Sequence, residues 1–116
     1  MPETLGQKQR RFTKMVGLLI EYAYQKGYEL TFGDAYRDPR VHGENGEKKS
    51  YSAASSVHKV RLAVDFNLFK DGVFLDKSED HKVLGEYWES MGGTWGGRFK
   101  PNADGNHYSL EHNGFK

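Results

Sequence analysis

The strongest structural signal in this chain is residues 62–75, which read LAVDFNLFKDGVFL. Apolar side chains alternate with other residues from Leu62 to Phe69, which is the period of a half-buried β-strand. Asp71-Gly72 then separates this run from a second apolar run, Val73-Phe74-Leu75. An Asp-Gly pair between two apolar runs is typical of a tight β-hairpin. We therefore expect an antiparallel hairpin at the centre of the fold.

Two amphipathic segments flank this hairpin and predict helices. Residues 4–26 carry apolar side chains at spacings of three or four, and Gly27 suits the position just after a helix. After the hairpin, residues 76–79 read DKSE, a capping box for a second helix that ends near Met91, before two glycines. Each helix would bury its apolar stripe against another layer.

Shorter alternating segments at residues 28–32 and 107–111 predict two further strands. Together with the hairpin they would form a small antiparallel sheet. The sequence thus predicts an α+β fold, in which two main helices pack on that sheet. With 116 residues in total, we expect one domain spanning 1–116.

Composition excludes several function classes. Seventeen basic and 16 acidic residues leave a net charge of +1, which argues against nucleic-acid and membrane-surface binding. The longest apolar run, residues 15–20, is far shorter than the roughly 20 residues that span a bilayer, and no signal-peptide pattern is present. Without any Cys, thiol chemistry and thiolate metal sites are excluded. A metal would need His and carboxylate ligands.

Asp65 is an acidic residue in the middle of the strongest predicted strand. Its parity places it opposite the apolar side chains, on the same face as Asn67. A carboxylate in a central strand is costly to desolvate unless it is paired, hydrogen-bonded or bound to a metal. His58, just before the strand, can fold back toward the same face. Two interpretations remain open: a metal site, or a buried pair between Asp65 and Arg61.

A second group of candidate residues lies at 104–107, which read DGNH. Gly105 and Asn106 suit a turn that would bring Asp104 and His107 to one side. Two histidines and one aspartate form a ligand set that Zn²⁺ accepts, with the fourth position left for water. A further carboxylate three residues from a ligand is a candidate general base.

Two other features have open interpretations. The polar stretch 38–56 is either a functional loop or a flexible excursion. His81 falls in the first turn of the second predicted helix, where we expect it to be exposed or half-buried.

Several motifs together resemble a known family. They are S-x-H-x-x-R-x-A-x-D at 56–65, Tyr36-Arg37, W-G-G-R-F at 95–99 and D-x-x-H at 104–107. The combination resembles the zinc D-Ala-D-Ala carboxypeptidases of peptidase family M15, and most of all their small phage endolysins, the L-alanyl-D-glutamate peptidases. The resemblance spans about residues 32–107 and implies a Hedgehog/D-Ala-D-Ala-peptidase-like fold.

The resemblance also implies roles for individual residues. The positions of His58, Asp65 and His107 would bind Zn²⁺, Asp104 would be the catalytic acid/base, and Arg37 would steady the substrate or transition state. The remaining matched positions are expected to contact substrate: Ser56, Tyr36 and Trp95. For Trp95 a position in the core is the open alternative. The sequence departs from many relatives at Arg61, where they carry Gly, and from larger relatives at Asp104, where they carry Glu.

The implied activity is hydrolysis of a peptidoglycan stem-peptide bond, L-Ala–D-Glu, for lysis of a bacterial host. The partner would be peptidoglycan, and the protein would act as a monomer with no nucleic-acid partner and no stable membrane association. It would be made in the host cytoplasm and reach the wall after the membrane is permeabilised. The alternatives are a D-Ala-D-Ala carboxypeptidase or dipeptidase, and a non-catalytic zinc-stabilised cell-wall-binding module.

Overall fold

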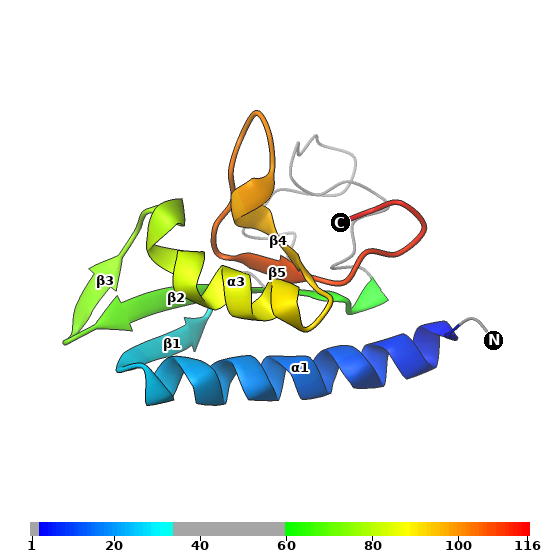
Figure 1. The fold of residues 1–116 in the computed structure, drawn as a ribbon, viewed down its shortest axis with the longest axis horizontal. Coiled ribbons are helices and arrows are strands. Elements are labelled where there is room, and N and C mark those ends of the chain that lie inside the picture. The colour runs from blue at the N-terminus through cyan, green and yellow to red at the C-terminus, as the bar shows by residue number, and fades with distance from the viewer. Residues whose placement is uncertain (1–2, 34–59) are drawn as a thin grey trace, which may run out of the picture.

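A computed structural model describes residues 3–33 and 60–116 of the chain. These residues form two α-helices and five short strands, together with two 3-10 turns (Figure 1). In chain order they are α1 (Leu5–Gln25), β1 (Tyr28–Phe32), β2 (Ala63–Lys70), β3 (Val73–Leu75), η2 (Ser78–His81), α3 (Lys82–Ser90), β4 (Thr94–Trp95), η3 (Gly96–Arg98) and β5 (His107–Ser109). The expected α+β class is confirmed.

Strand β2 is the centre of the sheet, whose order is β1-β2-β5-β4, with β3 also paired to β2. All pairs are antiparallel. Strands β5 and β3 pair with the same edge of β2: β5 with residues 63–65 and β3 with residues 68–70. The predicted hairpin is confirmed, and its two turn residues Asp71 and Gly72 both have positive φ, 53° and 77°.

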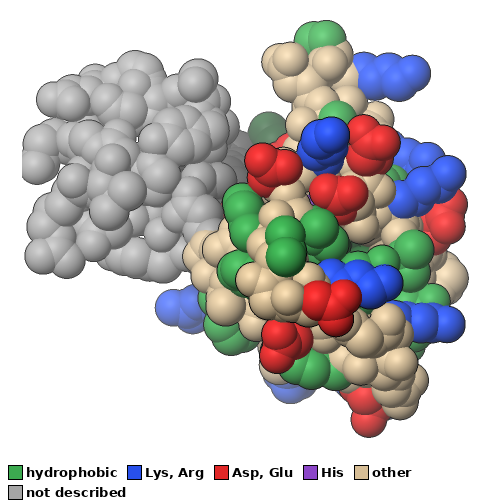
Figure 2. All heavy atoms as spheres, turned by 90° about the vertical axis from the view of Figure 1, so that its left-hand side faces the viewer, with side chains coloured by type: hydrophobic (Ala, Val, Ile, Leu, Met, Phe, Trp, Pro, Cys, Tyr) green, Lys and Arg blue, Asp and Glu red, His purple; other side chains and the backbone are tan. Residues whose placement is uncertain are grey.

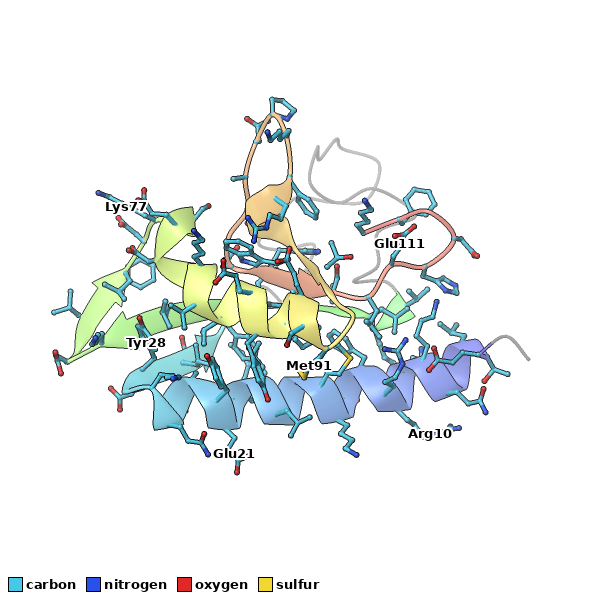
Figure 3. All side chains as sticks on the ribbon, in the orientation of Figure 1. Arg10, Glu21, Tyr28, Lys77, Met91 and Glu111 are labelled. Carbon is cyan, nitrogen blue, oxygen red and sulfur yellow. The ribbon has the colours of Figure 1, made fainter. Side chains whose placement is uncertain are left out.

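The two helices pack on each other and on the apolar face of the sheet. Helix α1 begins with a capping box between Thr4 and Gln7. Phe12 of α1 meets Trp88 of α3 edge to face, with ring centroids 5.6 Å apart, and Trp88 in turn contacts Tyr108 of β5. Polar side chains of α1, including the labelled Arg10 and Glu21, point away from the sheet (Figure 3).

Three local expectations need correction. The second helix starts as a 3-10 turn and becomes α-helical only at Lys82; its cap contact is Lys77 N–H to Asp80 Oδ2, 3.2 Å, rather than a box closed by Glu79. Strand β5 stops at Ser109, earlier than expected. Strand β4 was not expected, because two residues are too few to show an alternating pattern.

The surface agrees with the balanced composition. Figure 2 shows one face of the molecule, on which acidic and basic side chains are interspersed. Within residues 3–33 and 60–116, no helix is long and apolar enough to cross a membrane.

Candidate active site

Asp65 of β2 and His107 of β5 are direct cross-strand neighbours. Asp65 Oδ1 lies 3.4 Å from His107 Nδ1, and the two residues are only 5% and 6% exposed. The parity predicted for Asp65 is therefore confirmed, because Val64 and Tyr108, the next pair along, lie in the core. Arg61 is exposed, so among the described residues the buried carboxylate faces the imidazole of His107 and not the guanidinium of Arg61.

Asp104 reaches this pair through the turn that precedes β5. Its N–H donates to the carbonyl oxygen of Gly96 at 2.8 Å, and its own carbonyl accepts from the N–H of His107 at 3.1 Å. A Cβ on Gly96 would collide with the Asp104 carbonyl and crowd the His107 side chain. The glycine after Trp95 is thus what lets the turn approach η3 closely enough to place Asp104 beside His107.

Trp95 and Ser78 stabilise the same turn through hydrogen bonds to the main chain of Gly105. The Trp95 indole N–H donates to the Gly105 carbonyl at 2.7 Å, and the Gly105 N–H donates to Ser78 Oγ at 2.9 Å. Trp95 is 4% exposed and lies in the core. The core position that the sequence also allowed for Trp95 is the one observed, and its indole supports the turn that carries Asp104.

Asp65, Asp104 and His107 together form a possible metal-binding group. Their ligand atoms all lie within 4.8 Å of one another; Asp65 and His107 are buried and Asp104 is exposed. Two carboxylates and an imidazole are ligands that Zn²⁺ accepts, so the donors present fit the metal that the sequence predicts. The other predicted site residues, His58, Arg37, Tyr36 and Ser56, lie outside the described residues.

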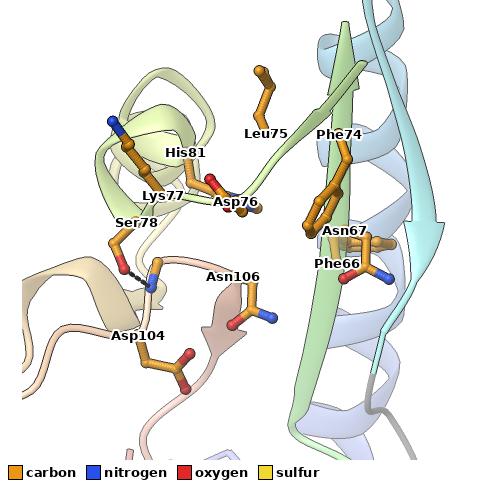
Figure 4. A pocket seen from close by; sticks show the side chains of 11 residues that line it. Phe66, Asn67, Phe74, Leu75, Asp76, Lys77, Ser78, His81, Asp104 and Asn106 are labelled. Atoms are coloured by element: carbon orange, nitrogen blue, oxygen red, sulfur yellow. Dashed lines mark hydrogen bonds between the residues drawn. The ribbon is translucent and has the colours of Figure 1, made fainter. Parts of the chain in front are cut away.

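A polar pocket of about 170 Å³ opens beside Asp104, where β3 and β5 part along β2 (Figure 4). The carboxamides of Asn67 and Asn106 lie on opposite sides of it. Asn67 Nδ2 donates to Thr31 Oγ1 of β1 at 3.2 Å, which orients that carboxamide. Sequence reasoning assigned neither residue to the site, although Asn67 has the same parity as Asp65, and that shared parity was the available signal.

His81 also lines this pocket, and it is buried rather than exposed or half-buried as expected. Its Nδ1 lies 2.7 Å from the hydroxyl oxygen of Tyr108. Burial lowers the pKa of His81 to about 4, with a smaller opposing effect of Asp80, and burial also raises the pKa of Tyr108. At neutral pH the imidazole is therefore uncharged, and it shares a hydrogen bond with the Tyr108 hydroxyl.

Comparison with known proteins shows the family of the chain. The chain is similar in fold to the crystal structure of the Serratia marcescens L-Ala D-Glu endopeptidase ChiX, with a TM-score of 0.63 and 19% sequence identity over 88% of this chain and 79% of that one. Among curated proteins, the sequence finds no match. A sequence model of the D-alanyl-D-alanine carboxypeptidase family matches residues 50–110, just over half of the chain. The chain therefore belongs to the M15 family of peptidases.

Proposed function

We propose that this protein is a zinc-dependent peptidase that hydrolyses a stem-peptide amide bond of peptidoglycan, the bond between L-Ala and D-Glu. The observation that carries the proposal is the convergence of Asp65, Asp104 and His107 within 4.8 Å, at the edge of a polar pocket. Membership of the M15 family supports the peptidase class. The choice of bond is supported by the fold shared with an endopeptidase of that specificity.

The buried pair Asp65 and His107 would hold the metal, with His58 as the third ligand that the resemblance implies. Zinc bound there would supply Lewis acidity, which lowers the pKa of water toward about 7 and polarises a carbonyl group. Asp104 is exposed and belongs to the pocket wall, so it suits proton transfer better than it suits a closed ligand position.

Each remaining residue of the site has a task that its position supports. Asp104 takes a proton from the attacking water and returns it to the leaving amine, because it stands where the metal group and the pocket meet. The carboxamides of Asn67 and Asn106 each offer a donor and an acceptor, which match the N–H and C=O of a peptide main chain. Arg37, placed by the resemblance alone, would stabilise the oxyanion.

The deciding experiment is mass spectrometry of purified peptidoglycan digested by the zinc-loaded protein. We expect muropeptide fragments with a new amino terminus on D-Glu, and none when the metal is chelated or when Asp104→Asn replaces the wild type. Release of free D-Ala would instead establish the carboxypeptidase alternative, which the family description favours. Zinc binding without any cleavage product would establish a non-catalytic wall-binding module.

We further propose that the biological role is that of a phage endolysin, acting as a monomer on the wall after the host membrane is permeabilised. The endolysin-like motifs of the chain support this role. Turbidity of permeabilised and intact cells, measured side by side, tests it: clearing should require permeabilisation. Analytical ultracentrifugation at the working concentration tests whether the protein is a monomer.

A further inference from the structure

The last residues of the chain form a tight reversal of their own. His112 and Phe115 exchange two main-chain hydrogen bonds, each 2.9 Å long. Between them, Asn113 and Gly114 have φ values of 51° and 85°. Positive φ at both central residues defines the turn type that Asn-Gly favours most strongly. The direction in which the chain leaves this turn is therefore fixed by local sequence.

This turn returns the chain to β5, beside the candidate metal group (Figure 1). The main-chain oxygen of Lys116 lies 2.8 Å from His107 Nε2. The same oxygen accepts a hydrogen bond from Ser109 Oγ at 3.0 Å. Ser109 is fully buried and stands two residues after His107, on the same face of the strand. One carbonyl oxygen thus joins two side chains of β5.

The contact determines which nitrogen of His107 can bind a metal. The main-chain oxygen of Lys116 only accepts, whether as a carbonyl or as part of a terminal carboxylate, so Nε2 carries the hydrogen, and in the neutral ring Nδ1 then presents its lone pair. Nδ1 is the nitrogen that faces Asp65, at 3.4 Å from Oδ1. Two ligands bound tetrahedrally at about 2.0–2.1 Å from one zinc ion lie roughly 3.3–3.4 Å apart. The observed separation matches a shared ion.

We propose that the segment 112–116 is a brace for the metal ligand: the Lys116 carbonyl fixes the tautomer and the ring orientation of His107, and Ser109 holds that carbonyl in place. This inference rests on the proposed function only in taking His107 as a zinc ligand. Partners of this kind, one step removed from the metal, typically change metal affinity by about 10–100-fold when they are lost. The brace acts through main-chain geometry, so the Lys116 side chain has no part in it.

Three variants distinguish an effect on the metal ligand from a general effect on folding. Deletion of residues 112–116 removes the carbonyl, and Gly114→Val strains the turn, because φ there is +85° while no atom within 4 Å would clash with the added Cβ. Lys116→Ala is the matched control, since it keeps the carbonyl. Zinc affinity, measured by competition with a chromophoric chelator, should fall roughly 10–100-fold in the first two and stay at the wild-type value in the third.

The second measurement is the ¹⁵N NMR signature of His107 in metal-free protein, at a pH where the ring is neutral. Wild type and Lys116→Ala should show the Nε2–H tautomer, and the deletion variant a mixture. Circular dichroism and thermal unfolding of the metal-free variants confirm that they fold. An unchanged zinc affinity together with an unchanged tautomer in the deletion variant would overturn the brace.

The outcome is independent of the proposed activity. If affinity and tautomer respond as expected but peptidoglycan is not cut, the brace stands and the peptidase proposal fails. If wild type cuts peptidoglycan while the deletion variant binds zinc as tightly as wild type, the brace fails alone. If the wild type binds no zinc, the proposal that segment 112–116 positions a metal ligand is wrong.

Discussion

Asp65 and His107 face each other across two adjacent strands, with 3.4 Å between Oδ1 and Nδ1. The separation is set by the register of β2 against β5, since each side chain projects from a hydrogen-bonded strand. Side chains on strands are held more precisely than side chains on loops. Asp104, by contrast, is exposed and comes from the turn before β5. The site therefore combines a rigid pair with one more accessible acid.

Asp104→Asn should abolish catalysis while leaving zinc binding close to wild type. The amide cannot take or deliver the proton, and the loss of a general base typically costs about 10²–10⁴-fold in rate. The release of muropeptide fragments measures the rate of hydrolysis, and competition with a chelator measures the zinc affinity. Asp76→Asn is the control, since it changes another exposed acid of the same pocket. Wild-type turnover by Asp104→Asn would refute the assignment.

His107→Ala should lose both the metal and the activity. Removing a direct ligand is expected to weaken zinc binding by more than the roughly 100-fold that marks the loss of an indirect partner. Wild type should gain about 2.7 kcal/mol of stability when free zinc is 100-fold above its dissociation constant. Thermal unfolding with and without zinc checks this, because the variant should show no such gain. A zinc-dependent shift of equal size in His107→Ala would exclude His107 as a ligand.

Stability should fall as the pH drops from about 6.5 to about 4, because of His81. Its pKa is about 4 in the folded protein and 6.5 in the reference state, so in this window the unfolded chain binds the additional proton. The contribution is fully present above pH 6.5 and is lost toward pH 4, up to about 3 kcal/mol. Urea unfolding at pH 7 and pH 4.5 measures it.

The matched variant for this pH effect is His81→Asn. Asparagine offers the Tyr108 hydroxyl both a donor and an acceptor without a titrating ring, so the stability difference between pH 7 and pH 4.5 should shrink. An identical pH dependence in the variant and the wild type would show that other groups are responsible.

Asn67→Ala should raise KM several-fold with little change in zinc affinity. The carboxamide lies in the wall of the polar pocket and is oriented by Thr31, so its loss removes a hydrogen-bonding partner for the peptide main chain. Steady-state kinetics on a soluble muropeptide separate KM from kcat. Thr31→Val should act in the same direction but more weakly, since it frees the carboxamide without removing it. An unchanged KM in Asn67→Ala would show that the Asn67 carboxamide does not contact the substrate.

Local patterns were enough to predict both helices, the strands β1, β2, β3 and β5, and the face of β2 on which Asp65 lies. The alternation from Leu62 to Phe69 and the Asp-Gly turn determined the central hairpin, and parity alone placed Asp65 on the face opposite the core. These predictions succeed because strand period and turn conformation depend on neighbouring residues. The 3-10 start of the second helix and the two-residue strand β4 were not predicted, because both depend on contacts with distant segments.

What only the tertiary structure decided is how separate segments meet. The register of β2 against β5 brings Asp65 to His107, Gly96 and Gly105 permit the close turn that places Asp104, and the burial of His81 and Trp95 follows from packing around that turn. The Asn113-Gly114 turn can be predicted from local sequence. The contact between Lys116 and His107 cannot, because it forms only when the turn and strand β5 are both in their folded positions. Residue types and spacings determine which chemistry is available; long-range packing determines which of those atoms come together.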